Sequence, residues 1–437
     1  MSGILNYILL LSAPGLPLLL AFPALRWRFS RPCHIALLPA VVLLAFPAGF
    51  SIELPWLLFG TELGIDGTSR LLLALSVVLW AAAGVFLQVP EGQSADNRFT
   101  TYYLLTLAAS LGAILAVDMV GFFAFSSLMG YAFYALLVAG GGEGSRRAGR
   151  IYLGLLILAD LALFEALLIA AAASDDLSFE AVHQALAGSP SLGLYLSMVL
   201  IGFAAKAGVW PLHFWLPLVF GSSRPPVALL LGGVPVAVGL LGAVRWLPLG
   251  EIISPDLGLV IQGLGVAAML FAILSGVKQA SLTMLPVHAT ILATGVFTIT
   301  IGAGLTDLAA WGRYENRAHY FIAALGCALA LLVIAIRWLE ARRHYPAAPA
   351  KQADDSSLRL ERWSGAVVAW AETTGYRTLP KWRVLWRVKM SRPWLVICAW
   401  KSALAAGERT LQRWTFAITL FLLLGMAVVF VGASPWR

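Results

Sequence analysis

The sequence predicts an all-α integral membrane protein of about twelve transmembrane helices, and three observations support this fold class. Of the 437 residues, 60% are hydrophobic and only 12% are charged, against roughly 25% charged in ordinary soluble domains. Apolar runs recur along the whole chain, and a helix of about 20 apolar residues crosses a hydrocarbon core about 30 Å thick. The charges between these runs alternate in sign, as they do in the loops of a multi-pass protein.

The apolar runs give the expected spans in chain order. They lie near residues 4–23, 34–52, 69–88, 100–117, 119–138, 151–173, 193–213, 226–248, 257–277, 281–304, 318–338 and 414–432. The first run has neither the basic start nor the small-residue cleavage site of a secretory signal, so we expect it to stay in the membrane as a span.

The loop charges orient these spans. Loops 24–33 and 139–150 carry clustered arginines, whereas the loops near 53–66, 175–180 and 251–256 are acidic. The positive-inside rule places the basic loops in the cytoplasm. With twelve spans, both termini then lie outside. We therefore expect a multi-pass protein of a bacterial-type cytoplasmic (inner) membrane.

Residues 339–413 differ from the rest of the chain. They hold 14 Lys/Arg and 6 Asp/Glu, which accounts for the whole net charge of +8. Tryptophans alternate with these basic residues, at Trp363, Trp370, Trp382, Trp386, Trp394 and Trp400. The pattern favours helices that lie on anionic lipid at the cytoplasmic surface, with the rings at headgroup depth. Docking onto partner subunits stays open, and a nucleic-acid surface is disfavoured because membrane spans bound the segment.

Cofactor and metal chemistry have little support in the sequence. Cys33, Cys327 and Cys398 lie far apart without a CxxC pair, and the histidines are dispersed, so zinc, iron–sulfur and disulfide-framework interpretations are disfavoured. The chain contains no GxGxxG after a strand, no phosphate-binding GxxxxGK[ST] and no GxSxG. We expect no bound cofactor, no metal and no catalytic residue in this chain.

Ionisable groups inside spans are the candidates for function, because each costs several kcal/mol unless it is paired or hydrated. The candidates are Asp160 and Glu165 in the sixth span, Lys206 and His213 in the seventh, and His288 in the tenth. Asp118 and Lys278 fall at span edges, where we expect the side chains to snorkel to the interface.

Lys206 is the most informative candidate. It lies in the middle of IGFAAKAGVWPLHFWLPLVF, far from either interface, where burial destabilises the ammonium and lets a lysine load and release a proton. Pro211 and Pro217 follow it and predict a broken helix, which membranes tolerate only where protein or water satisfies the freed backbone groups. With His213 seven residues on, this pattern indicates an ion path.

A structural salt bridge is the other interpretation of Lys206, with Asp160 or Glu165 as its partner. These two carboxylates are five residues apart on the sixth span, roughly 140° around a helix. At most one of them is therefore expected to face Lys206.

The segment KAGVWPLHFWLP resembles the signature of the antiporter-like subunits of respiratory complex I, shared with membrane-bound hydrogenases and multisubunit cation/proton antiporters. The pattern is a lysine, Lys206, then Pro-x-His-x-Trp-Leu-Pro at 211–217, then a helix led by Pro225 and Pro226. Two weaker similarities precede it. LGIDGTSRLLLAL at 63–75 resembles the opening of the family's third span, and AVDMVGFFAFSSLMGYAFYALL at 116–137 resembles its fifth.

The chain departs from the family pattern in four places. The fifth-span glutamate of Glu-Leu-Met, which pairs with the lysine in the family, is replaced by Ser127. Gly232 stands where the family has a histidine early in the eighth span. The stretch 281–295, SLTMLPVHATILATG, keeps only His288, and no His-Ala-Leu-Phe-Lys stretch follows residue 305. The second inverted repeat is therefore curtailed.

The resemblance implies an antiporter-like bundle with one intact five-helix repeat and a shortened second one. The expected parts are spans one to three at 1–99, the repeat with its broken helix around 206–217 at 100–250, the curtailed repeat at 251–338, the basic segment at 339–413 and a final transmembrane anchor at 414–437.

By this resemblance the chain is a subunit of a multisubunit membrane complex that conducts protons, less favourably sodium, or couples them to a redox or transport partner. Lys206 would be the switching charge, His213 a relay, and Asp160 or Glu165 the substitute for the missing carboxylate. Its partners would be other membrane subunits and a peripheral redox or zinc-containing module. The complex would be a quinone-linked or hydrogenase-type translocase.

Two alternatives stay open. The lost glutamate and shortened repeat favour a non-conducting structural subunit, whereas Lys206 and the broken helix favour conduction. A membrane partner of an inorganic-carbon uptake system is the third interpretation.

Overall fold

The computed structural model describes residues 2–26, 28–29, 31–47, 49–58, 60–85, 97–276, 284–344, 419, 421–424 and 426. Residues 1–335 and 411–437 group into one compact unit, and residues 336–410 group into a second. Most of the predicted surface segment 339–413, most of the predicted anchor 414–437 and Lys278 lie outside the described residues.

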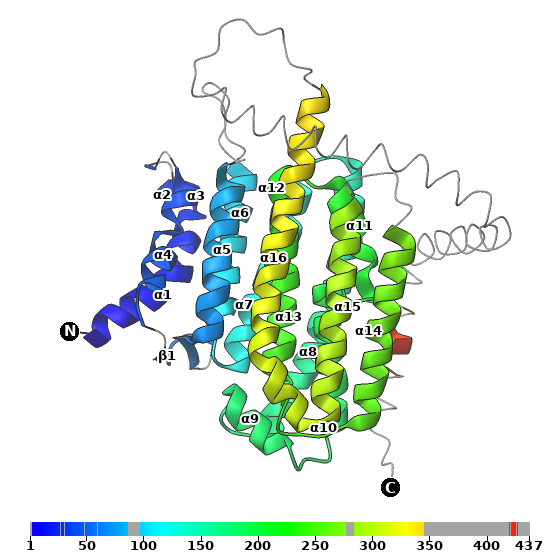
Figure 1. Cartoon of the computed structure of the whole chain (residues 1–437). Coiled ribbons are helices and arrows are strands. Elements are labelled where there is room, and N and C mark those ends of the chain that lie inside the picture. The colour runs from blue at the N-terminus through cyan, green and yellow to red at the C-terminus, as the bar shows by residue number, and fades with distance from the viewer. Residues whose placement is uncertain are drawn as a thin grey trace, which may run out of the picture. The chain divides into compact units, whose positions relative to one another are not determined.

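The described chain is helical apart from one hairpin, and its long helices run along a common axis (Figure 1). The N-terminal part contains α1 Ser2–Leu20, α2 Pro23–Arg26, α3 Pro32–Ile35, α4 Leu38–Leu44, β1 Phe50–Leu54, β2 Thr61–Ile65 and α5 Gly67–Val85. The central part contains α6 Asn97–Leu115, α7 Met119–Ala139, α8 Glu143–Ala173, α9 Phe179–Leu186, α10 Leu192–Ala207, the 3-10 turn η1 Leu212–Phe214 and α11 Trp215–Ser222. The last part contains α12 Pro225–Leu231, the π-helical turn η2 Gly232–Val236, α13 Ala237–Trp246, α14 Pro255–Gly276, α15 Leu285–Thr306 and α16 Leu308–His344.

Eight segments of the described chain are long and apolar enough to cross a membrane: 67–85, 119–139, 143–173, 192–222, 225–246, 255–276, 285–306 and 308–336. Two shorter apolar helical segments lie at Asn6–Leu20 and Pro32–Leu44. The prediction of a mostly helical, multi-pass membrane protein is confirmed. The count of twelve spans stays a prediction.

Two predicted boundaries were wrong. The run at 34–52 stops being helical at Leu44, and residues 50–65 form an antiparallel hairpin in which Phe50 pairs with Ile65 and Leu54 with Thr61. The run at 318–338 belongs to α16, which begins at Leu308. Its first turns carry exposed charges, Arg313 and Glu315 among them, so the apolar pattern starts later than the helix does.

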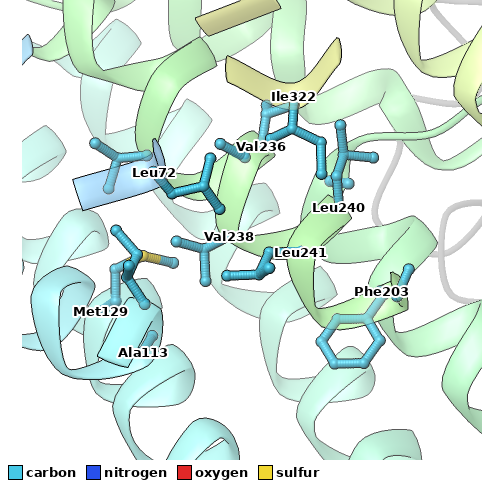
Figure 2. Close-up of a cluster of buried hydrophobic side chains, with 14 of the residues drawn as sticks. Leu72, Ala113, Met129, Phe203, Val236, Val238, Leu240, Leu241 and Ile322 are labelled. Carbon is cyan, nitrogen blue, oxygen red and sulfur yellow. The ribbon is translucent and has the colours of Figure 1, made fainter. Parts of the chain in front are cut away.

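The core surrounds α13. Figure 2 shows Val238 and Leu241 of this helix in a cluster of buried side chains that also includes Leu72 of α5, Met129 of α7 and Ile322 of α16. Glycines let the preceding turn η2 pack closely, because a Cβ at Gly232 would lie 2.4 Å from Leu329 of α16. A histidine at position 232 would require Leu329 to move.

The helices α14 and α15 pack backbone to backbone. Glycines recur seven residues apart on each helix, at Gly258 and Gly265 and at Gly295 and Gly302. A Cβ on Gly302 would lie 2.6 Å from the carbonyl oxygen of Gly258, and one on Gly265 would lie 2.7 Å from that of Gly295. Small residues allow this approach, which is a common mode of helix association in membranes.

One end of the bundle is tied together by Arg245 near the end of α13. Its Nη1 donates to the carbonyl oxygens of Ile114 (3.1 Å) and Ala116 (2.6 Å). Its Nη2 donates to Asp66 Oδ2 (3.2 Å) and Ser69 Oγ (2.8 Å). Burial raises the pKa of Asp66, but Arg245 and the Ser69 N–H outweigh burial and hold that pKa below its ordinary value.

Asp118 does not snorkel to the interface as predicted. Its carboxylate is buried and accepts from Gly121 N (2.7 Å), Thr61 Oγ1 (2.6 Å) and Glu62 N (2.8 Å). It therefore caps the N-terminus of α7 and joins that helix to β2. The carboxylate stays buried because protein groups supply the hydrogen bonds that water would otherwise provide.

Candidate functional site

The chain interrupts its seventh predicted span directly after Lys206. Helix α10 ends at Ala207, and Gly208 adopts the left-handed conformation at φ 66°, which glycine reaches at no steric cost. Val209 N donates to the carbonyl oxygen of Ala204 (2.8 Å), and the Trp215 indole donates to that of Ala205 (3.1 Å). Protein groups therefore satisfy the carbonyls at the helix end, as a break inside a membrane requires.

The two prolines predicted at this break have different positions. Pro211 lies in the non-helical segment before η1. Pro217 is the third residue of α11, where the first turn of a helix tolerates a residue without an N–H. The α-helix is therefore interrupted from Gly208 to Phe214, within the predicted region around 206–217, and Pro217 lies in the helix that follows.

Lys206 forms a buried ion pair with α8. Its Nζ lies 2.7 Å from Asp160 Oδ1, and the two side chains are 4% and 10% exposed. Nζ also donates to Ser126 Oγ (3.1 Å) and Ser127 Oγ (3.5 Å) of α7. Ser127 Oγ in turn donates to Asp160 Oδ1 (3.0 Å). Three helices thus place an ammonium, a carboxylate and two hydroxyls in one cluster.

Close packing of α8 on α10 selects Asp160 over Glu165. A Cβ on Gly202, one turn before Lys206, would lie 2.5 Å from Leu163 Cγ and 3.1 Å from the carbonyl oxygen of Ala159. The face of α8 that carries Asp160 therefore presses against α10. Glu165 lies on the exposed side of α8 and does not join the cluster.

The two histidines lie outside this cluster. His213 is fully buried in η1, neither ring nitrogen has a hydrogen-bond partner in the described part of the chain, and its ring lies 5.0 Å from that of Phe271. The Nδ1 of His288 lies 2.9 Å from the carbonyl oxygen of Met284. Among the described residues, no hydrogen bond or ion pair joins either histidine to Lys206.

An apolar cavity of about 80 Å³ adjoins the interruption. Trp210 and Pro211 line one side of it, Ile261 of α14 and Phe297 of α15 line others, and Leu424 also lines it. The segment between α10 and α11 therefore has free volume beside it.

Sequence reasoning missed two parts of this arrangement. Ser126 and Ser127 were considered only for the glutamate they replace, although two adjacent serines in an apolar span are a signal of a polar contact. Arg245 was left out of the intramembrane candidates, although it lies in the last turn of an otherwise apolar span. No group of three or more potential metal ligands is found among the described residues.

The chemistry available to the cluster is proton exchange. An ammonium and a carboxylate 2.7 Å apart can both lose their charge when one proton moves between them, and both groups can also exchange protons through the Ser127 hydroxyl. Asp160 Oδ2 has no hydrogen-bond partner in the described part, so one carboxylate oxygen remains able to accept a proton from another source.

Comparison with known proteins places these features in a family. Residues 116–337 match the family described as "NADH:quinone oxidoreductase/Mrp antiporter, TM". One subunit of a "Probable K(+)/H(+) antiporter" of Rhizobium meliloti is 31% identical over 175 residues, which are 39% of this chain and 32% of that protein. An "NAD(P)H-quinone oxidoreductase chain 4-3" of Nostoc is 27% identical over 283 residues, 62% of this chain and 49% of that protein. This chain thus covers half or less of either relative's length.

The fold has a counterpart among solved structures. One chain of a membrane-bound sulfane sulfur reductase, an archaeal respiratory membrane complex, superposes with a TM-score of 0.66 at 15% identity, over 99% of this chain and 94% of that chain. At this identity the similarity concerns the fold alone.

Proposed function

Because this chain belongs to the NADH:quinone oxidoreductase/Mrp antiporter transmembrane family, we propose that it conducts protons, or couples their movement to a partner, as one subunit of a larger membrane complex. The observation that carries this proposal is the buried pair of Lys206 and Asp160 beside an interrupted helix. A buried ion pair is weak evidence for stability, because desolvation of the two charges offsets much of their attraction. A pair poised between charged and neutral forms is suited to moving a proton.

Lys206 acts as the switching charge in this proposal. With a proton on Lys206, the ammonium is held by Asp160, Ser126 and Ser127. When the proton passes to Asp160 the pair becomes neutral, and the hydroxyl of Ser127 stays within hydrogen-bonding reach of both. Asp160 thus takes the role of the carboxylate that the family carries on the preceding span.

His213, which lies within the interruption, continues the path, with His288 beyond it. A fully buried imidazole with two unpartnered nitrogens among the described residues can receive a proton at one nitrogen and release it at the other. Sodium is the less favoured ion, because it would have to displace the Lys206 ammonium from the one carboxylate in the cluster.

The finer architecture also belongs to this proposal. The count of twelve spans is supported by the apolar runs and by the alternating loop charges. The intact repeat at 100–250 and the curtailed one at 251–338 are implied by the resemblance to the family. The basic segment 339–413 would rest on anionic lipid of a bacterial inner membrane. The relatives are named as parts of larger assemblies, which favours other membrane subunits as partners, with a peripheral redox or zinc-containing module beside them.

Two observations favour a second function, that of a non-conducting structural subunit. Gly232, packed closely against Leu329, stands where the family carries a histidine, and Ser127 stands in place of the family's glutamate. A chain that no longer conducts ions is expected to lose residues that conduction requires.

Lys206→Met separates these two functions, since it removes the ammonium and keeps the volume of the stem. The Asp160 carboxyl left behind can take up a proton and stay hydrogen-bonded to Ser127, so we expect the complex to assemble. Proton movement measured in vesicles that contain the purified complex should be lost. Lys206→Arg should also assemble and be inactive, because arginine holds the ion pair and does not release its proton. Full proton-coupled activity in assembled Lys206→Met would establish the structural function instead.

A further inference from the structure

Helix α8 exposes one carboxylate on an otherwise apolar face. Ile157, Leu161, Phe164 and Leu168 are between 44% and 57% exposed and follow one another at helical spacing. Glu165 is exposed among them. A transmembrane face that contacts only lipid has no use for a charge at this position.

Helix α7 extends this surface. Leu128 and Tyr131 are each 38% exposed, and the two helices are in contact, with the rings of Phe123 and Phe164 6.1 Å apart. We call the exposed residues of the two helices the α7–α8 face. It is formed by Leu128, Tyr131, Ile157, Leu161, Phe164, Glu165 and Leu168.

Glu165 lies deep in the span. It is eight residues before the end of α8 at Ala173, about 12 Å along the axis, which is beyond the reach of a glutamate side chain to the interface. It makes no hydrogen bond or ion pair with any residue that the structure describes. Its carboxylate therefore needs a partner that the described residues do not supply.

The described residues of the final segment lie elsewhere. Leu424 lines the cavity shared by α10, α14 and α15. The exposed face of α14 also differs in composition, since its large exposed residues, Leu259, Val260, Val266, Leu270, Ile273 and Leu274, are all aliphatic. That face suits lipid, whereas the α7–α8 face does not.

We propose that the α7–α8 face docks a transmembrane helix of a partner subunit that carries a lysine or arginine at the depth of Glu165. The ion pair would set the register of the two helices, and the surrounding apolar residues would exclude water from it. The pair would lie about 7.5 Å along α8 from Asp160. The inference rests on the proposed function only in that the chain works within a larger complex.

The test is labelling with dicyclohexylcarbodiimide, an apolar reagent that modifies carboxyl groups inside the bilayer. Glu165 should be labelled when the full chain is produced alone in membranes, and the labelling should be lost in the assembled complex. Peptide mass spectrometry locates the modified residue, and Glu165→Gln gives the background. Equal labelling of Glu165 in the two preparations would overturn the proposal.

Gly263→Glu in the Glu165→Gln background is the matched control. Gly263 is exposed on α14, eight residues from Pro255, and a Cβ there meets nothing within 4 Å. His183 of α9, which follows α8, lies 3.6 Å from Glu251 in the loop before α14, so the end of α8 and the start of α14 lie at the same end of the bundle and the two depths agree. The new carboxyl should be labelled alike in both preparations. If the carboxyl at position 263 were protected in the complex as strongly as Glu165, the complex would shield all carboxyls at this depth. That result would overturn the proposed ion pair at Glu165.

The same reagent can report the partner. Where the reagent still reaches Glu165 in the complex, the activated carboxyl that lies against a lysine forms an amide and releases the urea, so the reagent adduct is replaced by a cross-link. A cross-link from Glu165 to a spanning helix of another subunit therefore supports the proposal. An arginine partner gives protection without a cross-link. A cross-link to residues 345–410 of this chain would overturn it. Lys206→Met should leave the protection of Glu165 intact, so failure of proton conduction and failure of this inference are distinguishable.

Discussion

Removing the charge of Asp160 should destabilise the protein far more than removing both charges of the pair. In Asp160→Asn the Lys206 ammonium, whose side chain is 4% exposed, loses its counter-charge and keeps only neutral acceptors, the two serine hydroxyls among them. Breaking one side of a buried pair costs about 3–5 kcal/mol, whereas an apolar replacement of both partners is often neutral or stabilising. We therefore expect Lys206→Met combined with Asp160→Leu to recover most of the stability that Asp160→Asn loses.

The measurement is a double-mutant cycle of unfolding free energies for the full chain purified in mild detergent. Two results would refute the reasoning. A loss for Asp160→Asn of under ~1 kcal/mol, typical of an exposed pair, would show that water reaches the site. A double variant whose loss equals the sum of its two single losses would show that the two charges are not coupled.

Two further predictions concern packing and pH. Gly302→Val places side-chain atoms against the Gly258 carbonyl and should cost roughly 1–3 kcal/mol, whereas Gly263→Ala, with open space around it, should not lower the melting temperature. The pKa of Asp66 in the folded protein lies below its ordinary value. The pair with Arg245 therefore contributes its full stability above the ordinary pKa, and this contribution is lost as the pH falls through the folded-state pKa. Asp66→Asn should therefore melt with less dependence on acid below about pH 4, and unchanged acid sensitivity would contradict this.

The sequence was sufficient to locate the functional candidate because its two signals are local. A charged residue in an apolar run and a proline after it are both visible without any knowledge of packing, and Lys206 indeed lies one residue before the end of α10. The mostly helical, membrane-spanning character was also predicted correctly, because apolar length is a local property, whereas the boundaries near 34–52 and 318–338 were wrong.

The partner of Lys206 could not be chosen from the sequence, because helical spacing gives the angle between Asp160 and Glu165 but not which side of α8 faces α10. The choice depends on Gly202, whose missing side chain lets α8 approach. Asp118 was misjudged for a related reason. Its burial depends on donors from Thr61 and Glu62, which are far away in the chain.

The seam of glycines between α14 and α15 has a mechanical consequence. With backbone against backbone at Gly258 and Gly302 and again at Gly265 and Gly295, a rotation that brought a side chain onto this seam would place it against the main chain of the other helix. The seam therefore restricts how the two helices can move relative to each other. The cavity beside Trp210 and Pro211 is lined by residues of both helices and of the interrupted segment, so the free volume lies on the side of the seam where the chain is least regular.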